Sequence, residues 1–90
     1  MIVVDPCRSA GPRWLGIQAC QLISDQSVGE LLDFAQGLKL PMAWFQPRGP
    51  VPQFELSPHW RRKAIAAGAR AVDRVGFAEA TERWRLRNAR

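Results

Sequence analysis

Two signals for the start of a helix divide the chain and limit what it can fold into. Ser27 stands three residues before Glu30, the spacing at which a serine hydroxyl caps a helix and a glutamate reaches back to it. Ser57 is followed by Pro58, which favours a helix with serine as its cap and proline in its first position. The first of these helices should end near Pro41, because apolar residues recur at helical spacing only up to that point: Val28, Leu31, Leu32, Ala35 and Leu38.

Short apolar runs outside these helices predict strands at residues 2–4, 17–23, 42–46 and 69–72. Residues 53–56 alternate between polar and apolar, which predicts either a short strand or an extended lead-in to the helix that begins at Ser57. Residues 7–16 and 47–52 are rich in proline, glycine and arginine, and predict loops. A last helix is expected from Asp73 or Arg74 to about Ala89, with an inward stripe of Phe77, Ala80, Thr81 and Trp84. This order predicts a single α/β domain over residues 1–90, a small mixed sheet with about three helices, the helix at about 74–89 forming a detachable cover.

The composition indicates a folded, basic domain. The chain has 90 residues, enough for one domain, and 47% of them are apolar, too many for a disordered chain. Lysines and arginines number 13 against 8 acids, a formal net charge of +5, and arginine dominates. Arginine suits planar anions such as phosphate and carboxylate, so an acidic partner, including nucleic acid, is one interpretation. The other is a solvated arginine-rich surface.

Cys7 and Cys20 are the two cysteines, and they form neither a Cys-x-x-Cys motif nor a cluster with His59. We therefore expect no zinc site. The apolar run at the start is too short for an export signal, and no stretch is long enough to span a membrane. These features predict a cytoplasmic protein with two free thiols and no membrane partner.

Several short motifs follow one another with characteristic spacing. They are Val4-Asp5-Pro6, Cys20-Gln21-Leu22-Ile23-Ser24-Asp25, Glu30-Leu31, Phe34-Ala35, Trp44-Phe45-Gln46, Gln53-Phe54-Glu55-Leu56, Arg61 and Ala67-Gly68-Ala69. In this order they resemble a bacterial and phage family catalogued as domain of unknown function 4031, over roughly residues 2–73. The resemblance implies no established activity. A similar domain precedes a metal-dependent phosphohydrolase domain of the HD type in some relatives, which associates the family with nucleotide chemistry.

The chain departs from that family at positions that matter for chemistry. The resemblance leads us to expect histidine at Gln21 and Leu32, and His-Tyr-Asp where this chain has Gln53-Phe54-Glu55. Those histidines would be the natural metal ligands or general bases. Their replacement puts catalysis in doubt, and we name no catalytic residue and no resident cofactor.

Acidic residues follow or end three of the expected strands. Asp5, Asp25 and Glu55 should ring a crevice if the carboxyl ends of these strands meet, with Gln21, Gln53 and Arg61 near them. Carboxylates without histidine would favour a Mg²⁺-like ion over zinc, or would act as acid and base. The competing interpretation is that the acids cap turns and helices or are solvated.

Arg61, Arg62 and Lys63 lie in the first turns of the helix that begins at Ser57, where backbone N–H groups attract anions, and they form the candidate anion site. The alternative is a solvated helix face with Trp60 in the core. A second basic group ends the chain and is favourable near a helix C-terminus: Arg83, Arg85, Arg87 and Arg90.

Three functions fit these features. The first is non-catalytic binding of an anionic partner, nucleic acid or nucleotide phosphate. The second is a phosphoester-processing enzyme, or its decayed relative, that uses a carboxylate-bound divalent ion. The third is a protein-interaction domain, including a homodimer, that uses tryptophans and the loop 47–52. The absence of histidine at the positions where the resemblance leads us to expect it favours the first and third functions over the second.

Overall fold

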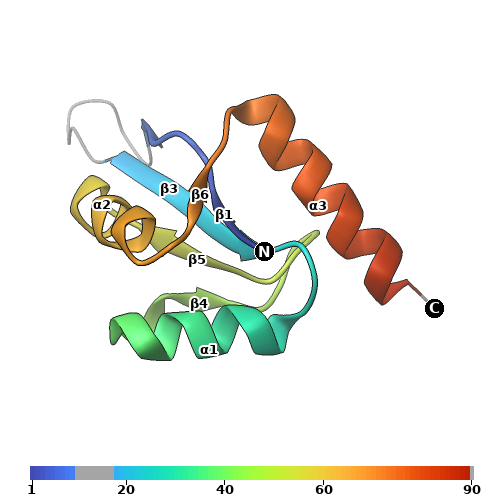
Figure 1. Cartoon of the computed structure of the whole chain (residues 1–90), viewed down its shortest axis with the longest axis horizontal. Coiled ribbons are helices and arrows are strands. Elements are labelled where there is room, and N and C mark those ends of the chain that lie inside the picture. Colours follow the sequence, from blue (N-terminus) through green and yellow to red (C-terminus); the bar gives the residue numbers. More distant parts are fainter. Residues whose placement is uncertain (10–17, 90) are drawn as a thin grey trace.

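The computed structural model describes residues 1–9 and 18–89 and contains a mixed sheet and three α-helices (Figure 1). Each predicted helix and each predicted strand region has a counterpart, which confirms the α/β fold. In chain order the elements are β1 (Ile2–Val4), β2 (Arg8–Ser9), β3 (Gln18–Ser24), α1 (Val28–Leu38), the 3₁₀ helix η2 (Met42–Trp44), β4 (Phe45–Gln46), β5 (Gln53–Leu56), α2 (Pro58–Ala66), β6 (Arg70–Ala71) and α3 (Arg74–Asn88).

The sheet has the strand order β4-β5-β3-β1-β6, with β2 paired to the start of β3. The central strand β3 is antiparallel to both β1 and β5, whereas β6 is parallel to β1. It follows that β1, β5 and β6 run in one direction and that their carboxyl ends meet at one edge of the sheet, which we call the carboxyl edge. The helices α2 and α3 begin just after β5 and β6, so both N-termini lie at this edge.

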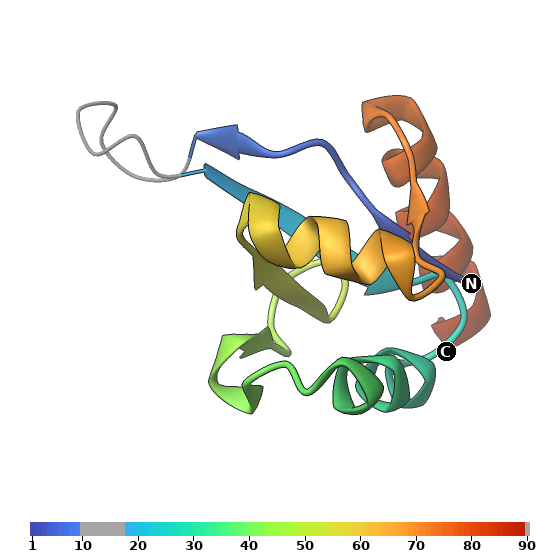
Figure 2. The same ribbon diagram turned by 60° about the vertical axis from the view of Figure 1, so that its left-hand side comes forward.

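Helices cover the two faces of the sheet unequally. Leu22 and Phe54 belong to the larger core, which also contains Leu31 and Ala35 of α1 and Ala64 of α2. On the opposite face a smaller core joins Val3 of β1 and Ile23 of β3 to Ala80 of α3, with Phe77 and Trp84 packed against it. Figures 1 and 2 show α3 set apart from α1 and α2. The inward stripe predicted for the last helix is therefore its contact with the sheet.

The predicted caps are confirmed at Ser27 and Ser57. The Ser27 hydroxyl accepts from the N–H of Glu30 at 3.1 Å, and the Ser57 hydroxyl accepts from the N–H of Trp60 at 3.3 Å. Asp73 caps α3 in the same way, accepting from the Gly76 N–H at 2.7 Å. The expected return contact of Glu30 to Ser27 is replaced, because the Glu30 carboxylate accepts instead from the Ser24 hydroxyl and from the amino group of Met1.

Two expectations about local structure need correction. The run at 42–46 is a strand only at Phe45–Gln46, because the Trp44 N–H turns back to the carbonyl of Pro41 and forms the 3₁₀ helix η2. The segment expected to be a loop contains β2, which pairs Arg8 with Ala19 and Ser9 with Gln18. Residues 10–16 of that loop, residue 17 of the expected strand 17–23 and Arg90 lie outside the described residues.

The prediction of two free thiols is wrong. Pairing between β2 and β3 brings Cys7 beside Cys20, with 4.3 Å between their Cα atoms, and the two form a disulfide. No local pattern around either cysteine indicates this contact, since it depends on which strands pair. Among the described residues, no helix has the length and apolar character to cross a membrane.

Candidate functional site

The strand directions decide which of the three candidate acids lie together. Asp5 follows β1 and Glu55 lies near the end of β5, so both are at the carboxyl edge. Both flank Gln21, because Gln21 is opposite Glu55 in the sheet and the Asp5 N–H donates to the Gln21 carbonyl. Asp25 follows β3, which runs the other way, and therefore lies at the opposite edge. Of the two interpretations of these acids, the one in which all three converge is therefore wrong.

Asp5 is a buried carboxyl group, 6% exposed. Its Oδ1 accepts from the N–H of Gln21 at 2.6 Å, and its carbonyl oxygen accepts from Nε of Arg61 at 2.9 Å. Burial raises the pKa of Asp5 above its ordinary value, although the Gln21 N–H and the charges of Arg8 and Arg61 oppose that rise. Asp5 is thus a carboxyl group that holds its proton more readily than a solvated one, beside two guanidinium groups.

Amide side chains connect the neighbouring strands on the face that carries Gln21. Nε2 of Gln21 donates to Oε1 of Gln53 at 2.8 Å, and Nε2 of Gln53 donates to Oε1 of Gln46 at 3.4 Å. Nε2 of Gln46 donates in turn to Oε2 of Glu55 at 2.8 Å. A chain of hydrogen bonds therefore runs across β3, β5 and β4 and ends at the Glu55 carboxylate.

An open cavity of about 330 Å³ lies beside this chain of hydrogen bonds. Its wall includes Trp44, whose ring lies 5.9 Å from that of Trp60 in an edge-to-face arrangement. The cavity is lined by residues of β3, η2, β4 and β5: Gln18, Ala19, Ala43, Trp44, Gln46, Glu55, Leu56 and Ser57. Ala19 pairs directly with Arg8 of β2, and directly opposed residues point to the same face of a sheet. Arg8 is therefore next to one residue of the cavity wall, although it is not part of the lining itself.

Sequence reasoning missed Arg8, Gln18, Trp44 and Gln46 as site residues. Trp44 and Gln46 did stand in a motif of the resemblance, but nothing local distinguished them from core or surface residues. Gln18 belongs to β3, which pairs with β5, and the pairing of β2 with β3 sets Arg8 beside Ala19 of the cavity wall.

The three cations proposed as an anion site point in different directions around α2. Nε of Arg61 is held by the Asp5 carbonyl, Nζ of Lys63 lies 4.8 Å from the centre of the Trp60 ring, and Arg62 is exposed. Successive helical residues are about 100° apart, which explains this spread. The N-terminal N–H groups of α2 are also largely used, because Pro58 has none and those of Trp60 and Arg61 bond to Ser57.

Asp25 holds the far edge of the sheet together. Its Oδ1 lies 2.8 Å from the amino group of Met1, and its Oδ2 accepts from Nε of Arg83 on α3 at 2.9 Å. Burial alone would raise the pKa of Asp25, but these two cations bring it below its ordinary value. Asp25 is thus a structural anchor for α3, and Arg83 of the C-terminal basic group is its partner.

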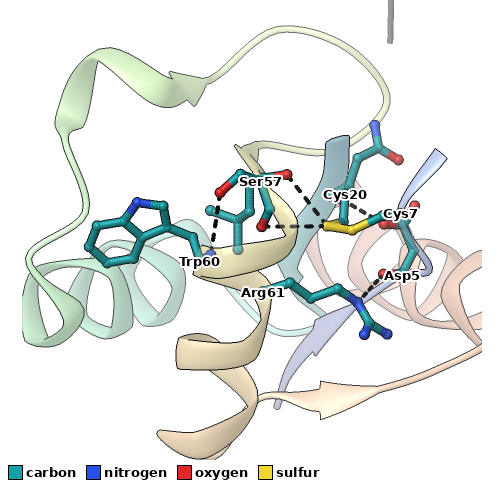
Figure 3. The surroundings of a disulfide bond; sticks show 8 residues. Asp5, Cys7, Cys20, Ser57, Trp60 and Arg61 are labelled. Atoms are coloured by element: carbon teal, nitrogen blue, oxygen red, sulfur yellow. Dashed lines mark hydrogen bonds between the residues drawn. A yellow bond between two sulfur atoms is a disulfide. The ribbon is translucent and has the colours of Figure 1, made fainter. Parts of the chain in front are cut away.

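Figure 3 shows the carboxyl edge around the disulfide, with Arg61 reaching Asp5 and Ser57 at the start of α2. The disulfide joins the segment that carries Asp5 and Arg8 to β3, and Sγ of Cys20 lies 3.4 Å from the carbonyl oxygen of Leu56. Among residues 1–9 and 18–89, no three histidine, cysteine or acidic side chains gather as a metal site would require. The chemistry of this edge is that of amides, two carboxyl groups and guanidinium groups.

The model of the family described as protein of unknown function (DUF4031) matches residues 2–85. The chain belongs to this family. Neither a curated protein nor a solved structure matches it. The DUF4031 match extends beyond the expected residue 73 and covers most of α3, so the helix that packs on Val3 and Ile23 falls within the family's domain.

The positions at which the DUF4031 resemblance led us to expect histidine separate into two groups. Gln21 and Gln53 are in direct contact, and Glu55, where aspartate was expected, lies opposite Gln21. Leu32 lies on α1 and packs against the larger core, on the other face of the sheet. Two of the three expected histidine positions therefore belong to the carboxyl-edge site, where this chain has amides.

Proposed function

We propose that this domain binds a nucleotide, free or within a nucleic acid strand, at the carboxyl edge without acting on it. The observation that carries the proposal is the cavity beside Trp44. Its volume of about 330 Å³ is at the lower end of the range of about 300–1,000 Å³ that is typical of small-molecule sites. One base with its sugar suits this size better than a larger cofactor.

The lining of the cavity supports a planar, polar ligand. Bases stack on aromatic side chains with about 1–3 kcal/mol per base, and Trp44 offers such a surface. Gln18, Gln46 and Glu55 supply donors and acceptors for a base edge. A purely apolar ligand would leave these groups without hydrogen bonds, which disfavours it.

Charge at the same edge supports a phosphate next to the base. Arg8 pairs with Ala19 of the cavity wall, and Nε of Arg61 donates to the carbonyl oxygen of Asp5. The formal net charge of +5 adds long-range attraction for an anionic ligand.

The test is a titration of the full chain with nucleoside monophosphates, followed by tryptophan fluorescence and by the amide NMR signals of Ala19, Gln46 and Glu55. We expect saturable binding that weakens with added salt. Arg8→Gln should weaken binding by roughly tenfold, the typical effect of losing one charged hydrogen bond. Arg87→Gln, an exposed arginine in the last turn of α3, is the matched control and should bind like the wild type. No saturable shift at the cavity would refute the proposal.

One specific observation favours a second function, the processing of phosphoesters with a divalent ion. Asp5 and Glu55 both flank Gln21, and two carboxylates at one edge can hold a Mg²⁺ ion together with a substrate phosphate. Turnover of a nucleotide or phosphodiester that requires Mg²⁺ and is lost in Asp5→Ala would make the domain an enzyme. Binding that is insensitive to salt and needs a protein partner would instead favour a protein-interaction domain.

A further inference from the structure

Glu55 gives the cavity a carboxylate, one oxygen of which is hydrogen-bonded to a neighbouring side chain. Its Oε2 accepts from Nε2 of Gln46, which in turn is held by Gln53. Glu55 belongs to the cavity lining, and Oε1 is the oxygen that Gln46 does not engage. An ionised carboxylate accepts hydrogen bonds and donates none. The cavity thus contains a strong acceptor that favours ligands with N–H or O–H donors.

We propose that the nucleotide bound at this site is a guanine nucleotide, an inference that rests on the proposed function. Guanine has two adjacent N–H groups on its Watson–Crick edge, at N1 and at the 2-amino group. A carboxylate can accept from both together, as it does from the paired N–H groups of an arginine side chain. Glu55 is the residue that would make this contact.

The other bases fit this carboxylate less well. In adenine and cytosine the amino group stands beside a ring nitrogen that accepts hydrogen bonds, so one carboxylate oxygen would face a lone pair. In uracil the ring N–H stands between two carbonyl oxygens. Hypoxanthine keeps the N1–H of guanine but lacks the 2-amino group, which makes it the sharpest comparison. A base that turns an acceptor toward the Glu55 carboxylate gains no hydrogen bond from it and meets like partial charges, so such a base should bind less tightly than guanine.

The remaining lining residues suit the other side of the same base. Guanine carries acceptors at O6 and N7. The side-chain amide of Gln18, which also lines the cavity, can donate to such acceptors. The Trp44 ring also offers a larger stacking surface to a purine than a pyrimidine can use.

The experiment compares guanosine, inosine, adenosine, cytidine and uridine monophosphates on the full chain by isothermal titration calorimetry. We expect guanosine monophosphate to bind at least about tenfold more tightly than inosine monophosphate, the effect of one hydrogen bond to a charged group. In Glu55→Gln this difference should shrink to less than about threefold. The variant keeps an acceptor for Gln46 and lies at an exposed position, so it should fold normally.

Arg87→Gln is the matched control and should keep the full preference for guanine. Equal affinity for all five nucleotides, or a preference for another base, would overturn the guanine assignment while leaving nucleotide binding intact. A guanine preference that survives Glu55→Gln would overturn the role of Glu55. Failure of every nucleotide to bind would refute the proposed function and this inference with it.

Discussion

Reduction of the Cys7–Cys20 disulfide should lower the stability of the domain by about 3 kcal/mol. The two cysteines are 13 residues apart in the sequence, and closing a loop of that length removes about this much conformational free energy from the unfolded chain. A domain of this kind has a total stability of about 5–15 kcal/mol, so the loss is a large share. The midpoint of thermal unfolding should fall by roughly 12–24 °C for a chain of this size.

The assay is urea unfolding followed by tryptophan fluorescence, with and without dithiothreitol, after thiol titration has shown that the oxidised sample contains no reactive thiol. Cys7→Ser is the matched variant, because it breaks the cross-link and leaves Cys20 in its buried position beside the Leu56 carbonyl. It should unfold like the reduced wild type, and dithiothreitol should not change it further. Two reactive thiols in the untreated protein, or equal stability of both redox forms, would refute the reasoning.

Three further changes test the core and the two edges of the sheet. Phe54→Ala should cost about 3–5 kcal/mol in urea unfolding, because Phe54 is fully buried; a cost below about 1 kcal/mol would contradict this packing. Asp5→Asn should raise stability at neutral pH, since asparagine keeps an acceptor for the Gln21 N–H and removes a charge whose pKa burial raises. This gain in stability should vanish at a pH below the ordinary pKa of aspartate. A lower stability of Asp5→Asn than of the wild type at neutral pH would contradict the prediction. Burial alone would raise the pKa of Asp25, but the amino group of Met1 and Arg83 outweigh it and bring the pKa below its ordinary value. The ionised Asp25 therefore stabilises the fold at a pH above the ordinary pKa of aspartate, and this contribution is lost as the pH falls through the lowered pKa of the folded protein. In Asp25→Asn the free energy of unfolding should fall less steeply as the pH is lowered from about 6 to 2. The same fall as in the wild type would show that the ion pairs of Asp25 do not contribute.

The positions of the helices could be predicted from the sequence because capping residues act within a few residues of the helix start. Ser27 caps α1 and Ser57 caps α2 as expected, and Asp73 caps α3. The short β-branched run at 2–4 became β1 for the same local reason. The exception, the 3₁₀ turn at Met42–Trp44, arose where an apolar run without β-branched residues follows Pro41.

The residues of the candidate site could be predicted from the sequence only in part. Asp5, Gln21, Gln53 and Glu55 were named as crevice residues, and the structure brings them together. Asp25 was named with them, because it also follows a strand. Its separation from Asp5 depends on the antiparallel pairing of β1 with β3, and no local pattern in either segment specifies that direction.

The sequence by itself determined the helix caps, the approximate strands, the mixed α/β class and the family. Each of these depends on neighbouring residues or on the order of short motifs. The tertiary structure alone decided which strands are neighbours and in which direction they run. The pairing of the strands joins Cys7 to Cys20, places Arg8 beside Ala19 of the cavity wall and puts Asp25 at the edge of the sheet opposite Asp5. The physical reason is that sheet pairing and side-chain packing join segments far apart in the chain, and their free energy is gained only when those segments meet.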